Sequence, residues 1–160
     1  MNYRYPGARL SEDSYTNLDN LGPTAATEFK LKVPGRVRKE GKTLRVKPLW
    51  YSNMVRRMAR KPERHYDIFM VYRTSFALSS KLAVPSGHEI ASLPAGVKID
   101  NDLIYYSRYC SLDASSVTSK RVLTLKKRKI SRARYQEFRE ICSKIDQAEE
   151  QDIVLQPLDL

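Results

Sequence analysis

The side chains best able to do chemistry in this 160-residue sequence are two cysteines and two histidines, Cys110, Cys142, His65 and His88. A cysteine nucleophile needs a thiolate that an adjacent imidazole activates and a third group orients. Cys142 falls on the apolar stripe of a predicted helix, where we expect a buried and inert thiol. Cys110 lies in a predicted strand, with no helix N-terminus nearby in the sequence to lower its pKa. We therefore expect no catalytic residue, and an enzyme that uses Cys110 is the least favoured function.

The histidines and the cysteine spacing indicate no other reactive site. His65 lies among charged residues and His88 follows the turn glycine Gly87, so both are expected in surface loops. A disulfide between Cys110 and Cys142 stays open, because the sequence does not show whether they come within bonding distance. The spacing of the cysteines matches no zinc motif, and the sequence has no glycine-rich phosphate loop. We expect no metal ion and no cofactor.

Positive charge is concentrated in two parts of a chain whose formal net charge is +11. Residues 30–73 hold fourteen basic and three acidic side chains, and residues 120–134 hold eight basic and none acidic. An anion-binding surface is one interpretation, for nucleic acid, acidic polysaccharide, lipid headgroups or an acidic protein. The other interpretation is that the strands face water and that their Lys and Arg side chains protect the sheet edges from aggregation. The candidate anion-binding residues are Lys126, Lys127, Arg128, Lys129, Arg132 and Arg134.

The elements that must position these residues include one clear helix, predicted over residues 132–146. Its apolar side chains recur at three- and four-residue spacing and form a single stripe. Ser131 is the expected N-cap, and Glu137 and Glu140 lie on the solvated side. A lone helix in a strand-rich chain must pack its stripe on a sheet. The stripe consists of Tyr135, Phe138, Ile141, Cys142 and Ile145.

Strands are predicted from residue 27 to residue 125. Residues 36–46 predict a hairpin, residues 49–58 a short helix or a loop, and residues 67–78 the best central strand, which breaks at Ser79-Ser80. Spacing of roughly 10 to 14 residues between strands favours antiparallel over parallel βαβ pairing. The predicted fold is mainly β, an antiparallel β-sandwich with one C-terminal amphipathic helix packed on it.

The predicted domain organisation is one β-sandwich domain over residues 27–156. Residues 1–26 are polar and are expected to form an arm or linker, and residues 157–160 a tail.

The basic block over residues 120–134 lacks aromatic side chains. It is therefore a poor match to a nucleic-acid site, because stacking of bases requires aromatic rings between the cations.

An ordered set of motifs carries a family resemblance. They are Ala83-Val84-Pro85-x-Gly87, Leu93-Pro94, Lys129-Ile130-Ser131 followed by Tyr135 and Phe138, and Asp152-Ile153-Val154-Leu155. The set resembles the β-rich domain of unknown function that follows the transglutaminase-like core in large bacterial, often exported, proteins. The resemblance spans about residues 27 to 156, and it implies that the catalytic core lies upstream, outside this chain.

The expected function is therefore a non-catalytic accessory or interaction module associated with a transglutaminase-like (papain-like) core carried elsewhere. Its partner would be that core or another protein domain, and a polyanion is a further candidate. The alternative is a small basic binding protein for nucleic acid or another polyanionic surface. No apolar run reaches the roughly 20 residues of a membrane span, and the N-terminus lacks the apolar stretch of a signal peptide. The localisation stays open, although the resemblance implies an exported or envelope protein.

Overall fold

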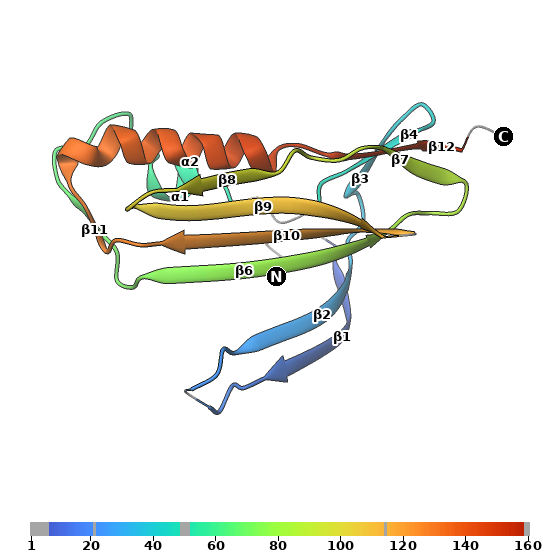
Figure 1. The fold of residues 1–160 in the computed structure, drawn as a ribbon, viewed down its shortest axis with the longest axis horizontal. Helices are drawn as coiled ribbons and strands as arrows, with labels where there is room; N and C mark the ends of the chain where they lie inside the picture. Colours follow the sequence, from blue (N-terminus) through green and yellow to red (C-terminus); the bar gives the residue numbers. More distant parts are fainter. Residues whose placement is uncertain (1–6, 21, 49–51, 114, 159–160) are drawn as a thin grey trace. The chain divides into compact units, whose positions relative to one another are not determined.

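The computed structural model describes residues 7–20, 22–48, 52–113 and 115–158 (Figure 1). The chain divides into two compact units, unit 1 (Met1–Arg38) and unit 2 (Lys39–Leu160). Leu49, Trp50 and Tyr51, which the sequence placed at the start of a short helix or loop, lie outside the described ranges. In the described part of the chain, no helix is both long and apolar enough to cross a membrane.

Unit 1 contains a β-hairpin. β1 (Arg9–Thr16) pairs in antiparallel fashion with β2 (Ala26–Lys32). Asn17 takes a positive φ, which asparagine tolerates, and its Nδ2 donates a hydrogen bond of 3.1 Å to the carbonyl of Thr24 across the loop. The segment predicted as a polar arm, residues 1–26, therefore contains a strand. Every residue of β1 is exposed, so the strand lacks the apolar face by which a sequence pattern identifies one.

A four-stranded antiparallel sheet in the order β6-β10-β9-β8, called the long sheet, is the central element of unit 2. Its register is uninterrupted: Leu125 pairs with Thr74 and Ile104, and the ladder continues to Ser116. Alternate residues of β10 are buried, as expected for a strand with one face on the core. The strands are β6 (Thr74–Ala83), β8 (Val97–Asp100), β9 (Ile104–Asp113) and β10 (Ser116–Leu125).

The predicted C-terminal helix packs against one end of the long sheet. The chain first forms a 3-10 turn, η1 (Arg132–Arg134), and then α2 (Tyr135–Glu149), which begins and ends three residues later than the predicted helix over 132–146. The stripe is confirmed, because all five of its residues belong to the same buried cluster as Ile104, Tyr106 and Leu123 of the sheet. The short helix α1 (Met54–Met58) packs beside α2 and adds Met54 to this cluster.

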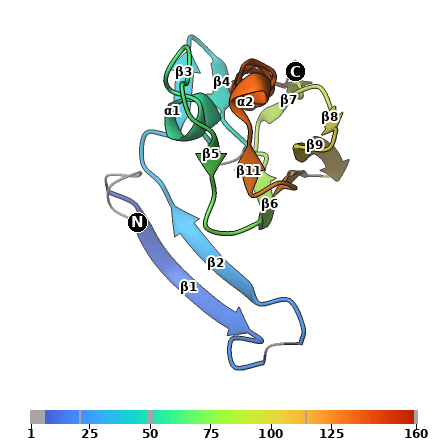
Figure 2. The same cartoon turned by 90° about the vertical axis from the view of Figure 1, so that its left-hand side faces the viewer.

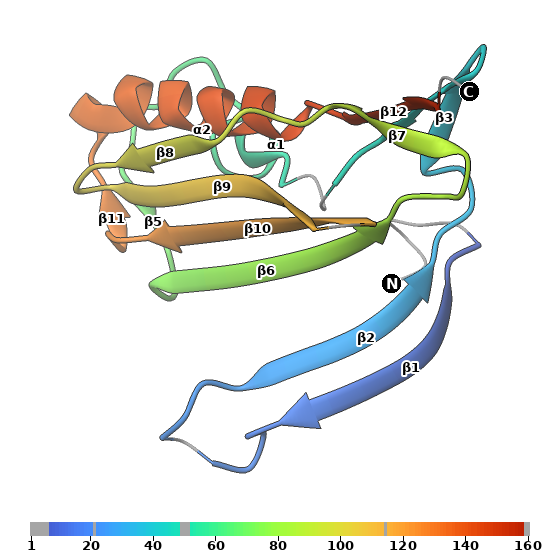
Figure 3. The same cartoon turned by 45° about the vertical axis from the view of Figure 1, so that its right-hand side comes forward.

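A second sheet, in the order β3-β4-β12-β7, faces the other end of the long sheet. Ile153 and Leu155 of β12 contact Val117 of β10 in a separate buried cluster. Figure 3 shows α2 and this second sheet following one another along the same side of the long sheet. The predicted antiparallel β-sandwich with a C-terminal helix is therefore confirmed. The strands are β3 (Val37–Glu40), where the boundary between the units falls, β4 (Thr43–Val46), β7 (His88–Ser92) and β12 (Ile153–Pro157).

A short ladder closes the end of unit 2 at which α2 begins. β5 (Ile68–Phe69) pairs with β11 (Lys129–Ile130), as Figure 2 shows from that end. The prediction of one continuous strand over residues 67–78 is wrong, because residues 70–73 separate β5 from β6. The predicted break at Ser79-Ser80 is also wrong, since both serines pair with β10 in an unbroken register. Serine is compatible with a strand when a neighbouring strand satisfies its backbone.

Candidate functional site

The predicted anion-binding block lies around β11, and carboxylates from other elements pair with two of its lysines. Lys126 Nζ lies 2.6 Å from Asp100 Oδ1 at the end of β8, and Lys129 Nζ lies 3.0 Å from Asp67 Oδ2 just before β5. A hydrogen bond from Lys126 lowers the pKa of Asp100. The backbone N–H of Arg132, followed by Lys129, lowers the pKa of Asp67. These two lysines are therefore partly neutralised.

Arg134 is paired more completely. Its Nη2 donates to Asp102 Oδ1 at 2.8 Å, and its Nε donates to Glu137 Oε2 at 2.9 Å. The hydrogen bond from Arg134 is the main reason that the pKa of Asp102 is lowered. Arg134 thus joins the loop before β9 to the first turn of α2, and its guanidinium has two carboxylate partners already.

The other three predicted residues keep their charges exposed. Lys127 and Arg128 lie in the loop between β10 and β11, and Arg128 Nε contacts the carbonyl of Met70 at 3.5 Å. Arg132 uses its backbone N–H, which donates to Asp67 Oδ1 at 2.7 Å. This bond does the capping that the sequence assigned to Ser131, whose side chain makes no cap hydrogen bond. The structure brings the six residues together, but carboxylates pair with half of them.

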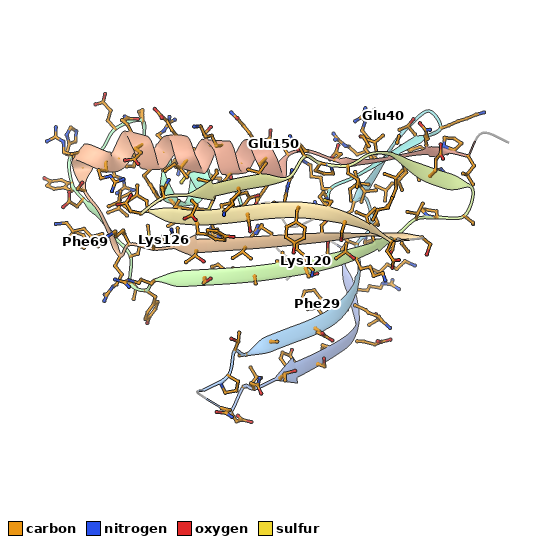
Figure 4. The ribbon with its side chains drawn as sticks, in the orientation of Figure 1. Phe29, Glu40, Phe69, Lys120, Lys126 and Glu150 are labelled. Carbon is orange, nitrogen blue, oxygen red and sulfur yellow. The ribbon has the colours of Figure 1, made fainter. Side chains whose placement is uncertain are left out.

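The same end of unit 2 exposes large apolar side chains in and beside the segment that the sequence predicted as one strand, residues 67–78. The register places Phe69 opposite Lys129, and the Lys129 ammonium lies 5.5 Å from the centre of the Phe69 ring. Figure 4 shows Phe69 and Lys126 at this end. The sequence did not reveal that residues 70–73 interrupt the strand. This interruption turns the side chains out of the core. We name this group the aromatic tip: Tyr66, Phe69, Val71, Tyr72 and Phe76.

The interior of unit 2 holds a charged network that the sequence analysis missed. Arg121 of β10 and Glu149 of α2 form an ion pair of 2.9 Å between side chains that are 10% and 3% exposed. Ser52 donates to Glu149 from both its N–H (2.5 Å) and its Oγ (3.0 Å). Tyr106 lies 3.5 Å from the same carboxylate, and burial raises the pKa of its hydroxyl. The sequence pattern of β10 could have indicated this network, because alternate residues of the strand face the core and Arg121 occupies one of those positions.

Two further buried charges hold the ends of helices. Asp146 of α2 accepts hydrogen bonds from the N–H groups of Met54 (2.6 Å) and Val55 (2.9 Å), which caps the N-terminus of α1. Arg108 of β9 donates to the carbonyl of Ala148 near the C-terminus of α2 and to Ala95 O at 2.8 Å. Each of these charges binds backbone groups of another element.

The four residues first considered for chemistry do not form a site. Cys142 lies on the buried face of α2, and burial raises the pKa of its thiol to about 12. Cys110 packs in the other buried cluster, with its Sγ 3.2 Å from Ser119 Oγ, and both cysteines are free thiols. His65 is exposed and His88 is half-buried in β7. Over residues 7–20, 22–48, 52–113 and 115–158, no group of three or more His, Cys, Asp or Glu residues is arranged to hold a metal ion.

Comparison with known proteins gives a family and a fold. A solved structure described as "a putative protease from Parabacteroides distasonis ATCC 8503" is similar, with a TM-score of 0.52 and 10% sequence identity. The similarity covers 60% of this chain and 19% of that chain, so this chain corresponds to about a fifth of the neighbour's length. No curated protein matches the sequence. The family model that matches is a domain of unknown function with a solved structure, DUF3858, over residues 42–155. Because the match covers more than half of the chain, this protein belongs to the DUF3858 family.

Proposed function

We propose that this chain is a non-catalytic accessory module that docks onto a transglutaminase-like (papain-like) core carried elsewhere. The observation that supports this most is the role of the buried charges. Arg121 pairs with Glu149 across the sheet–helix interface, and Asp146 caps a neighbouring helix. Buried charges that are paired and hydrogen-bonded in this way join elements together, whereas a catalytic group faces a cavity in which substrate can sit.

The thiols support the same conclusion. Attack on a carbonyl requires a thiolate, and the raised pKa of Cys142 keeps its thiol protonated. Cys110 contacts a serine hydroxyl, which is a poor general base because it does not accept a proton near neutral pH. Among the residues that the structure describes, neither cysteine is hydrogen-bonded to a histidine, the partner that a papain-like nucleophile uses.

The solved structure adds support from its size. A fold similar to this one covers 19% of a much longer chain that is itself described as a putative protease. An accessory module is expected in that setting, since the remaining four-fifths of such a chain provide room for another domain. The proposal takes the transglutaminase-like nature of the core from the family resemblance of the sequence motifs.

The experiment is an activity assay on the isolated chain with glutamine-containing peptides, with and without an amine acceptor. We expect no peptidase and no transamidase turnover above the rate without protein. A Cys110→Ser variant is the control. Turnover by the wild type that the variant loses would overturn the proposal. The genomic sequence upstream of the Met1 codon gives a second test, because we expect it to encode a Cys–His–Asp domain.

A further inference from the structure

The aromatic tip exposes a concentrated apolar surface at one end of unit 2. Phe69, Val71 and Tyr72 are 72%, 71% and 74% exposed, and they fall within four consecutive positions of the chain. Side chains of this size scattered singly on a surface need no explanation, whereas several of them within one short exposed segment are typical of an interaction site.

Exposed cations surround this surface. Arg73 follows Tyr72 directly, and the β5–β11 ladder brings Lys127 and Arg128 to the same end of the unit. Within the residues that the structure describes, none of these three side chains forms an ion pair with a carboxylate. The carboxylates nearby are already paired, Asp67 with Lys129 being the clearest case. The uncompensated charge beside the apolar tip is therefore positive.

We propose that the aromatic tip anchors the protein to an anionic phospholipid bilayer. Phe69, Val71 and Tyr72 would enter the headgroup region, where aromatic side chains are favoured. Arg73, Lys127 and Arg128 would contact the lipid phosphates while their stems cover apolar surface. This binding activity goes beyond the proposed accessory function and does not depend on it.

A bilayer fits this surface better than single-stranded nucleic acid does. Nucleic acid would stack its bases on free aromatic faces along a basic track. Val71 has no aromatic face, and the Lys129 ammonium already lies over the Phe69 ring. Asp67, Asp100 and Asp102 also interrupt the cations of β11 and its flanks. A bilayer requires no continuous row of cations. The aromatic tip and its three adjacent cations provide the apolar contact and the electrostatic attraction that stable interfacial binding requires.

The test is co-sedimentation of the full chain with phosphatidylcholine vesicles that contain or lack phosphatidylglycerol. We expect binding to the anionic vesicles alone, weakened by added salt. The tip variant, Phe69→Ser with Val71→Ser and Tyr72→Ser, should lower the partition coefficient at least about tenfold, because one of the two signals is lost. The charge variant, with Arg73, Lys127 and Arg128 changed to Ser, should lower it about 100-fold, at roughly 1 kcal/mol per cation.

The matched control removes exposed apolar side chains from β9, by Tyr109→Ser with Leu112→Ser, and should bind as the wild type does. Circular dichroism checks the fold, and Val71→Ser alone, in a loop position, replaces the triple variant if that variant is unfolded. A labelled oligothymidylate is titrated in parallel. The proposal would be overturned if the protein did not bind the vesicles, or if the tip variant bound them as well as the wild type does. It would also be overturned if the protein bound the oligonucleotide through the tip but did not bind vesicles.

Discussion

The guanidinium of Arg121 and the carboxylate of Glu149 lie 2.9 Å apart in the interior of unit 2. Arg121 comes from the middle of β10 and Glu149 from the last turn of α2, so the ion pair joins the sheet to the helix. Ser52, which precedes α1, donates two hydrogen bonds to the same carboxylate. Three segments far apart in the sequence therefore meet at Glu149.

We predict that Glu149→Gln destabilises the protein by about 3–5 kcal/mol, because it removes the carboxylate that pairs with the buried guanidinium of Arg121. Urea unfolding followed by circular dichroism measures the change. The double variant Arg121→Met with Glu149→Leu should recover most of the loss, since it removes both charges together. If Glu149→Gln costs less than about 1 kcal/mol, the pair is hydrated and does not hold the helix to the sheet.

The stripe of α2 gives a second prediction. Phe138 is completely buried between the helix and the long sheet, so Phe138→Ala should cost about 3–5 kcal/mol through lost apolar contact and the cavity that remains. Chemical denaturation measures the difference. Phe76→Ala is the matched control, because Phe76 is 55% exposed at the sheet edge, and its cost should be much smaller. Equal costs at the two positions would contradict the packing of α2.

The sequence correctly predicted the elements whose buried residues recur at a regular spacing. The predictions failed where contacts between distant segments determine the structure. The stripe of α2 repeats on one face, and the structure confirms it. Residues 67–78 were predicted as one strand, but the interruption at residues 70–73 depends on the pairing of β5 with β11, which are about sixty residues apart. The same reason explains the half-neutralised basic block. The partners of Lys126 and Lys129 are Asp100 at the end of β8 and Asp67 just before β5, so no local pattern includes them.

The ion pairs around β11 predict an acid-sensitive stability. Lys126, Arg132 and Arg134 lower the pKa values of Asp100, Asp67 and Asp102, respectively, from the ordinary 3.8. A carboxylate whose pKa is lower in the folded state stabilises that state above the unfolded pKa, and the contribution disappears as the pH falls through the folded value.

The free energy of unfolding should therefore be level between about pH 7 and pH 5 and should fall below about pH 4. Denaturant titrations across this range measure it. Added salt should reduce the effect, because Asp100 and Asp102 are exposed to solvent and Asp67 is partly exposed. A variant with the three aspartates changed to asparagine should lose part of the decline. An unchanged profile in that variant would assign the acid sensitivity to other groups.

The two thiols are expected to react at different rates. Cys142 is fully buried with a pKa raised to about 12, whereas Cys110 is only partly buried. Alkylation by iodoacetamide should therefore modify Cys110 first and Cys142 only when the protein unfolds. Mass spectrometry of peptides from a time course identifies each site, and the same reaction in urea is the control. Modification of Cys142 in the native protein would place α2 away from the sheet.

The most direct test of the accessory-module account is calorimetric titration of this chain into the separately produced transglutaminase-like core that the account expects its genome to encode upstream. Saturable binding with a stoichiometry of one, together with a higher melting temperature of the core in the complex, is the predicted result. The Phe138→Ala protein, which loses its own packing, should bind more weakly. A titration that shows no heat and leaves the melting temperature of the core unchanged would contradict the account.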